Sequence, residues 1–180
     1  MALTPPENKH WWREPLHRME IGWITIAFLW GLMMFGVMIY WHINGEQNLS
    51  NEAYRVDPET YGEKVEAFAE KYTVRTEGKN DTPVVKPPPG SDVYMLGRLW
   101  EWWPILELKK DQTYRLHLSS MDWQHGWSLQ PTNINIQVHP KYEMVMTLKP
   151  TKSGEFGVVC NEFCGVGHHT MLGKIYVVDK

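Results

Sequence analysis

Two cysteines, the only ones in 180 residues, stand close to a histidine and a methionine near the C-terminal end of the chain. Cys160 and Cys164 are four positions apart, His168 follows four positions later, and Met171 three after that. Thiolate and thioether sulfurs together with an imidazole nitrogen form a ligand set that favours copper. Glycines within this stretch allow the backbone angles of a tight loop. The residue types and their spacing therefore predict a copper site.

Two other sites could be built from the same residues. A disulfide between Cys160 and Cys164 would close a very short loop, so it would constrain the unfolded chain only weakly. It would also leave the spacing of His168 and Met171 unexplained. A zinc knuckle is the second alternative, but zinc sites rarely use methionine. The softness of the four possible ligands therefore favours a copper site over a disulfide or a zinc knuckle.

The wider pattern resembles the copper A (CuA) loop of cytochrome c oxidase subunit II. The matching positions are Cys160, Glu162, Cys164, His168 and Met171. In that family a histidine on an earlier strand completes the site, and here the stretch Asp122-Trp-Gln-His125-Gly-Trp127 fits. The resemblance extends from an apolar segment near the N-terminus to the C-terminus. Nitrous oxide reductase carries a similar loop, but that enzyme is far longer and has no membrane helix ahead of its copper domain.

The resemblance implies a dinuclear copper centre whose two thiolates bridge both metals. The implied ligands are Cys160 and Cys164 as bridges, His125 and Met171 on one copper, and His168 and the backbone carbonyl of Glu162 on the other. His168 is favoured over His169 by spacing alone. The carboxylate of Glu162 would stay free, and in many family members it binds magnesium or manganese where subunit II meets subunit I.

A run of aromatic residues, Leu99-Trp-Glu-Trp-Trp103, resembles the segment through which cytochrome c delivers electrons in this family. Three tryptophans in four positions cannot all point inward on a strand, because side chains alternate between its two faces. At least one should lie near the surface, and Trp100 or Trp102 is expected to receive the electrons.

An apolar segment near the N-terminus is expected to anchor the site to a membrane. No charged residue occurs from Ile21 to Trp41, and a helix of this length spans roughly 30 Å, the thickness of a bilayer core. The run is too long for a signal peptide, and it lacks the polar face of a soluble helix. We therefore predict a transmembrane helix over residues 21–43.

The distribution of lysine and arginine predicts the orientation of this helix. Lys9, Arg13 and Arg18 precede it, whereas the first such residue after it is Arg55. The positive-inside rule then places residues 1–20 in the cytoplasm and residues 44–180 on the outer side of a bacterial or archaeal cell membrane.

Residues 44–91 are expected to form a connector with one short helix. Asp57 and Pro58 are a capping residue and a first-turn proline, and strong helix formers follow, which predicts a helix over 58–72. The Pro-rich stretch 76–90 indicates an extended linker.

Residues 92–180 change to short β-rich runs separated by turn residues. The predicted strands are Val93–Leu99, Ile105–Leu108, Thr113–Ser119, Trp127–Leu129, Ile134–Val138, Tyr142–Leu148, Glu155–Val159 and Lys174–Val178. Strands of this number and length predict a mainly β, Greek-key sandwich. The resemblance makes this a cupredoxin-like β-sandwich or barrel with the copper ligands on loops at one end.

The resemblance implies an electron-accepting subunit of a membrane oxidase. Its partners would be the haem–copper subunit I, cytochrome c or a soluble cupredoxin as electron donor, and membrane lipid. The net charge of −3, with no basic run, argues against a nucleic-acid partner. The single helix and the Arg55-Val-Asp-Pro58 stretch resemble the B-type branch of the haem–copper oxidases.

Three other functions use some of the same features. A nitric oxide reductase of the same superfamily can carry a CuA subunit, and the difference lies in its catalytic chain. A membrane-anchored copper-delivery protein typically binds one copper through exposed ligands. Quinol oxidase subunits share the fold but lack the copper ligands, so Cys160 and Cys164 argue against that function.

Overall fold

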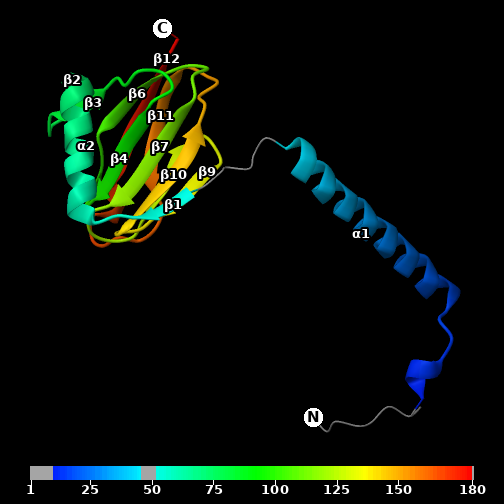
Figure 1. Ribbon diagram of the computed structural model, residues 1–180. Coiled ribbons are helices and arrows are strands. Elements are labelled where there is room, and N and C mark those ends of the chain that lie inside the picture. The colour runs from blue at the N-terminus through cyan, green and yellow to red at the C-terminus, as the bar shows by residue number, and fades with distance from the viewer. Residues whose placement is uncertain (1–9, 46–51, 180) are drawn as a thin grey trace. The chain divides into compact units, whose positions relative to one another are not determined.

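The computed structural model of the chain describes residues 10–45 and 52–179. They belong to two separate units, an N-terminal helix and a β-rich domain, whose boundary falls after residue 48 (Figure 1). A short 3-10 helix, η1 (Trp11–Arg13), precedes the long helix.

The long helix α1 (Arg18–Asn44) confirms the predicted apolar helix, with ends at 18 and 44 rather than at 21 and 43. It begins earlier because His17 and Glu20 form a capping box. The Nδ1 of His17 accepts from the N–H of Met19 at 3.3 Å, and Glu20 accepts from the N–H of His17 at 2.7 Å. Among the described residues, α1 is the one helix long and apolar enough to cross a membrane.

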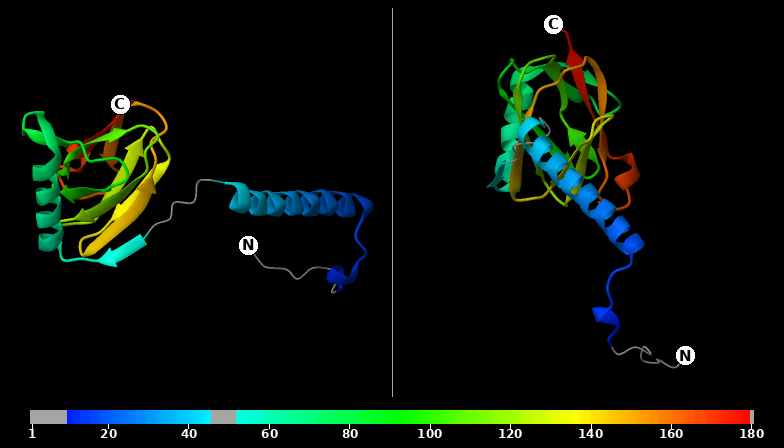
Figure 2. Two further views of the ribbon diagram at one scale, coloured as in Figure 1. Left: turned by 45° about the horizontal axis from the view of Figure 1, so that its top comes forward. Right: turned by 90° about the vertical axis from the view of Figure 1, so that its right-hand side faces the viewer.

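Two β-sheets make up the second unit and face each other across a shared core (Figure 2). In spatial order, the five-stranded sheet contains β1 (Glu52–Arg55), β10 (Tyr142–Leu148), β7 (Tyr114–Ser120), β4 (Asp92–Arg98) and β5 (Glu101–Trp103). The seven-stranded sheet contains β2 (Thr73–Glu77), β3 (Thr82–Val85), β6 (Ile105–Lys109), β12 (Leu172–Val178), β11 (Gly154–Cys160), β8 (His125–Gln130) and β9 (Ile134–Val138). The described chain therefore confirms the predicted mainly β sandwich.

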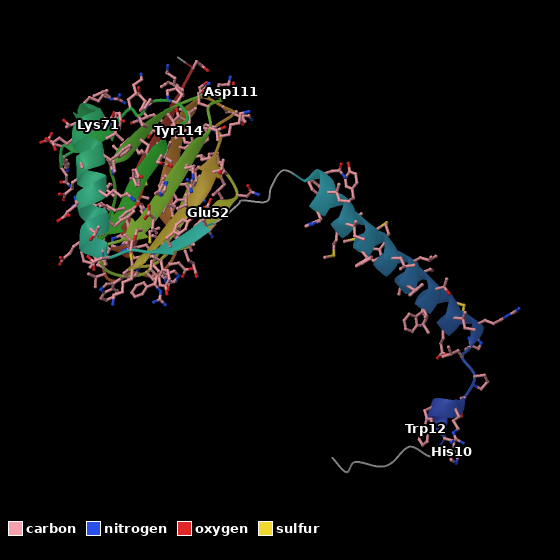
Figure 3. All side chains as sticks on the ribbon, in the orientation of Figure 1. His10, Trp12, Glu52, Lys71, Asp111 and Tyr114 are labelled. Atoms are coloured by element: carbon pink, nitrogen blue, oxygen red, sulfur yellow. The ribbon has the colours of Figure 1, made fainter. Side chains whose placement is uncertain are left out.

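The core lies between the two sheets and follows from the alternation of apolar residues. Leu116 and Leu118 on β7 are fully buried, while Arg115 between Tyr114 and Leu116 is exposed. Val158 and Ile175 meet them from the opposite sheet in the same apolar cluster. Figure 3 labels Asp111 and Tyr114 at the end of the sandwich where β7 begins. The residues predicted to bind the metal lie at the other end, where β8 begins and β11 ends.

Helix α2 (Pro58–Tyr72) confirms the predicted helix, and its Asp57 cap accepts from the N–H groups of Glu59 and Thr60. It lies beside the sandwich (Figure 1) and buries Tyr61 and Val65 against Leu96 of β4. The hydroxyl of Tyr61 donates to the carbonyl of Met95 at 3.1 Å, which satisfies its buried polar atom.

The prediction of a simple connector over 44–91 was wrong for its described part. β1 joins the edge of one sheet through β10, and β2 and β3 extend the other sheet, where β3 pairs in parallel with β6. The described part of the compact unit therefore starts at Glu52 and not at residue 92. The strand β3 within 76–90 was not predicted, because it is held by pairing with β6, some 20 residues later in the sequence, and has no local pattern of its own.

A charged cluster on the seven-stranded sheet ties β2 and β3 to β6. The nearly buried carboxylate of Glu107 contacts Arg75 at 2.5 Å and Lys86 at 2.9 Å. These two cations hold the pKa of Glu107 below its ordinary value. A carboxylate with a lowered folded-state pKa stabilises the fold above its unfolded pKa of about 4.3, and that contribution is lost as pH falls through the folded value.

We expect Glu107→Gln to lower the free energy of unfolding at neutral pH by about 1–3 kcal/mol, because the substitution removes hydrogen bonds between charged groups from a mostly buried site. The gap between variant and wild type should close as the pH falls below about 4. Chemical denaturation of the chain across pH measures both effects. Glu155→Gln is the matched control, because its pair with Lys174 is exposed and should change stability by less than about 0.5 kcal/mol. A gap that persists at low pH would contradict this account.

Candidate metal centre

Two buried sulfur atoms form the middle of the candidate site. Cys160 is the last residue of β11, and Cys164 lies in the loop that follows. Both thiols are free, and their Sγ atoms are 3.7 Å apart. Exposure is 4% for Cys160 and none for Cys164. Two thiols this close and this sheltered from water offer a shared soft binding site.

Each sulfur has a histidine nitrogen beside it. His125, fully buried, is the first residue of β8, and its Nδ1 lies 3.9 Å from the Sγ of Cys160. His168 begins the 3-10 helix η2 (His168–Thr170), and its Nδ1 lies 3.6 Å from the Sγ of Cys164. The side-chain ligand atoms of His125 and the two cysteines lie within 4.8 Å of one another.

The two weaker donors predicted from the sequence complete the group. The buried Sδ of Met171 is 3.7 Å from the Sγ of Cys164, and the backbone carbonyl of Glu162 is 3.3 Å from the Sγ of Cys160. All predicted ligand residues are thus brought together around the two sulfurs. His169 is exposed instead. Two thiols, two imidazoles, a thioether and a carbonyl are donors that suit copper.

Asp122 fixes the orientation of the His125 ring. Its Oδ1 lies 2.8 Å from the Nε2 of His125, so that nitrogen carries the proton and Nδ1 keeps its lone pair toward Cys160. The other carboxylate oxygen accepts from the N–H of Leu99 at 2.7 Å. One side chain therefore orients a ligand and joins the loop after β4 to the loop before β8.

We expect Asp122→Asn to weaken copper binding by about 10- to 100-fold, because the histidine loses its charged acceptor. An amide nitrogen also cannot accept from the N–H of Leu99. Competition with a copper chelator measures the affinity. Asp111→Asn at the opposite end of the sandwich is the control and should leave it unchanged (Figure 3). Equal affinities for the Asp122 variant and the wild type would exclude the orienting role.

Burial raises the pKa of the Cys164 thiol to about 12, and the neighbouring Cys160 contributes in the same direction. At neutral pH the metal-free thiol therefore keeps its proton. A bound metal must replace that proton, because the thiolate is the ligand.

The tryptophans of the aromatic segment occupy different environments. Trp100 is half-buried, and its Nε1–H donates to the carbonyl of Cys164 at 3.0 Å. Its indole lies over Gly167, where any side chain would collide with the ring. Trp102 is only 2% exposed and packs edge-on against the His125 ring, with centroids 5.8 Å apart. Trp100 reaches the surface, which confirms the expectation that at least one of these tryptophans does. Trp102, the other candidate for electron entry, lies in the core.

Sequence reasoning missed two contacts that shape the site. Gln137 on β9 donates to the Glu162 carboxylate at 3.0 Å, and no local pattern links residues so far apart. Gly126 has no room for a side chain, because a Cβ there would lie 2.9 Å from the backbone nitrogen of Glu162. The glycine directly after the ligand histidine was the available signal, since strand interiors use glycine where another backbone comes close.

No model of a known protein family matches the chain. Individual proteins do. The chain is 27% identical over 165 residues to a cytochrome c oxidase subunit 2 of Thermus thermophilus, and the match covers 89% of this chain and 92% of that protein. It is 33% identical over 112 residues to another cytochrome c oxidase subunit 2 from Thermus thermophilus, with 59% of this chain and 83% of the relative covered.

A solved structure agrees with these relatives. One chain of a heme-copper terminal oxidase dimer, studied by cryo-electron microscopy, superposes with a TM-score of 0.58 at 25% identity. The match covers 89% of this chain and 100% of the other. Sequence and fold thus lead to one conclusion: the chain belongs to the cytochrome c oxidase subunit 2 family.

Proposed function

We propose that this chain is the electron-accepting subunit of a membrane haem–copper oxidase and that it holds a dinuclear copper A centre. Membership of the family implies association with an oxidase complex that includes subunit I. The proposed ligands are Cys160 and Cys164 as bridges, His125 and Met171 on one copper, and His168 with the Glu162 carbonyl on the other. When bound, such a centre supplies one-electron transfer with little change of geometry.

The observation that carries this proposal is the pair of free, buried sulfurs 3.7 Å apart, each with a histidine Nδ1 within 3.9 Å. The burial of Cys164 and Met171 also supports electron transfer over copper delivery, because a delivery protein needs ligands that a recipient can reach. The sandwich fixes His125 at the start of β8, Cys160 at the end of β11 and Met171 directly before β12, which limits the movement of the loop that carries the other ligands.

The donor is proposed to be cytochrome c or a soluble cupredoxin, and the acceptor a haem in subunit I, where oxygen is reduced. The purified complex should consume oxygen when supplied with reduced cytochrome c. Consumption of nitric oxide in place of oxygen would identify a nitric oxide reductase. A complex that oxidises neither reduced cytochrome c nor a reduced cupredoxin would overturn the proposed function.

Trp100 is the proposed contact for the donor, because it is half-buried at the surface and bonded to the copper loop through Cys164. We expect Trp100→Phe to slow reduction by cytochrome c about tenfold while copper content stays unchanged. Trp102→Phe should have a smaller effect on this rate, since Trp102 is in the core. Stopped-flow reduction of the complex measures both. An unchanged rate for Trp100→Phe would refute the assignment.

The Glu162 carboxylate is proposed to contribute to a magnesium or manganese site shared with subunit I. It already accepts from Gln137, so one of its oxygens is held in place. The remaining oxygen ligands would come from the partner. Metal analysis of the complex with Glu162→Gln tests this, and loss of the hard cation with both copper ions retained is the expected result.

The β-rich domain is proposed to lie outside the cell, with residues 1–20 in the cytoplasm and the part of α1 over residues 21–43 in the lipid bilayer. The positions of Lys9, Arg13 and Arg18 before the span support this orientation. Added protease should cleave the domain in intact spheroplasts. Cleavage only after the membrane is broken would show that the domain lies in the cytoplasm, which would contradict the proposed orientation.

A further inference from the structure

A cavity opens at the end of the sandwich opposite the candidate metal centre, and the function described so far does not use it. Its volume is about 250 Å³. The segment from Lys149 to Lys152, which joins β10 to β11, forms one side of it. The carbonyl of Pro150 in this segment accepts from the N–H of Asp111 at 2.7 Å, and Figure 3 labels Asp111 at this end of the sandwich. The cavity is therefore a feature separate from the copper loop.

The walls of the cavity are apolar and belong to the folded core. Six side chains from five strands line it: Leu129, Ile134, Leu148, Phe156, Ile175 and Val177. All of them except Ile134 and Phe156 are buried. An apolar cavity stays largely dry and takes up apolar molecules in preference to water. The inner part of the cavity thus fits the apolar body of a ligand.

Two features keep this space open in the folded chain. Gly154 pairs with Val177 of the wall, and a Cβ added to this glycine would meet nothing within 4 Å. Its φ of 145° favours glycine over any residue with a side chain. On another side, the Oγ1 of Thr132 donates to the carbonyl of Leu129 at 2.6 Å and accepts from the N–H of Ile134 at 3.2 Å. A site held open in this way needs little rearrangement when a ligand binds.

Two lysines carry positive charge at the mouth of the cavity. Lys149 and Lys152 line it and are exposed to solvent. Neither pairs with a carboxylate in the described part of the chain, whereas Lys110 on the neighbouring loop pairs with Asp179. An ammonium group is a donor without acceptor capacity, so two of them can hold the two oxygens of one carboxylate. The mouth thus fits an anionic head group.

The volume of the cavity limits the size of the apolar body. An engineered cavity of about 150 Å³ in another protein is filled by benzene. The larger volume here holds one aromatic ring with a short chain that leads to the mouth. Drug-sized ligands use pockets of about 300 Å³ or more, so they are too large. The ring of Phe156 in the wall favours an aromatic body, because ring–ring contacts stabilise a complex beyond the burial of area.

We propose that this cavity binds a small aromatic monocarboxylate, whose ring lies among the six apolar side chains and whose carboxylate is held by Lys149 and Lys152. The inference goes beyond the proposed function and does not depend on it, because the residues that line the cavity include none of the proposed copper ligands.

Three probes with one apolar body and different head groups test the ligand class: 3-phenylpropionate, 3-phenylpropanol and 3-phenylpropylamine. Isothermal titration calorimetry of the intact complex in lipid nanodiscs measures their binding, with empty nanodiscs as the blank. One 3-phenylpropionate should bind per chain. The alcohol should bind at least about fivefold more weakly, and the amine more weakly still, because the lysines repel it. Equal affinities for the acid and the alcohol, or no binding of the acid, would overturn the proposal.

Variants of the lining residues test the location. The double variant Lys149→Gln, Lys152→Gln should lower the affinity for 3-phenylpropionate at least about fivefold and leave that for the alcohol unchanged. Lys79→Gln is the matched control and should change neither affinity, because Lys79 is also an exposed lysine without an ion pair in the described chain, in the turn between β2 and β3. Ile134→Phe fills the cavity and should weaken binding of the acid and the alcohol together. Copper content and oxygen consumption should be the same in all of these complexes.

An unchanged affinity of the double lysine variant for 3-phenylpropionate would place the bound molecule elsewhere and overturn the proposal. So would a well-assembled Ile134→Phe complex that binds the acid like the wild type. The lysine substitutions change only exposed side chains, so they decide the question even if Ile134→Phe fails to fold. A complex that binds the acid as expected but holds no copper would overturn the proposed function and leave this site in place.

Discussion

Replacement of Cys164 by serine is expected to abolish the metal centre and, with it, turnover of the oxidase. Cys164 is fully buried, and its sulfur is within 3.7 Å of Cys160, His168 and Met171. The Cys160 sulfur contacts the other proposed ligands, His125 and the Glu162 carbonyl, so the two sulfurs together touch the whole set. A hydroxyl is a hard, weak donor that cannot bridge two copper ions as a thiolate does. Copper affinity should fall by more than about a hundredfold, beyond the loss caused by a residue that only supports a ligand.

Metal analysis and oxygen consumption of the purified complex measure the two effects. Met171→Leu is the informative comparison, because it removes a weak ligand from the same sulfur and leaves both thiols in place. That variant should keep its copper and show a shifted reduction potential. A serine variant that retains two copper ions and normal turnover would mean that Cys164 is not a bridge.

Gly126→Ala is expected to have the second largest effect, although the substitution adds one methyl group. The new Cβ would lie 2.8 Å from the Cγ and 2.9 Å from the backbone nitrogen of Glu162, and would also collide with Asn161. A backbone atom cannot move aside as the end of a flexible side chain can. The loop that carries Glu162 and Cys164 would therefore be displaced from His125, the neighbour of Gly126.

We expect a loss of copper affinity of about 10- to 100-fold and a changed absorption spectrum of any copper that remains. Gly157→Ala is the matched control. It lies in β11 of the same sheet, and a Cβ there would meet nothing within 4 Å. If both variants bind copper like the wild type, close approach of the two segments does not shape the site.

Strands with their own local pattern could be predicted from the sequence. β7 and β10 alternate apolar and polar residues, and both appear close to their predicted bounds. Helix α2 followed from a capping aspartate and a first-turn proline. Such elements are defined by residues that are neighbours in the chain, so their signal is visible without the fold.

Elements held by distant partners could not be predicted. β1 is exposed at all four positions and carries no alternation, and it is ordered by pairing with β10 about 90 residues later. β3 contains Pro83 and lies within a stretch of linker-like composition, yet it pairs with β6. Composition indicated the exposure of β1 correctly, but it indicated neither the burial of Val84 and Val85 in β3 nor the pairing of either strand.

The candidate site likewise contains features that could be predicted from the sequence and features that depend on the fold. The spacing from Cys160 to Met171 reflects one loop, so its ligands could be proposed from the sequence. The support given by Asp122 to both His125 and Leu99 depends on two loops that meet only in the fold. The burial of Trp102 likewise depends on the opposite sheet, where its side chain packs against Gly173.

Copper analysis together with electron paramagnetic resonance of the oxidised complex shows whether two sulfurs share two copper ions. We expect two copper ions per chain and a mixed-valence signal in which both ions share one unpaired electron. One copper per chain with the signal of a single isolated ion would contradict it.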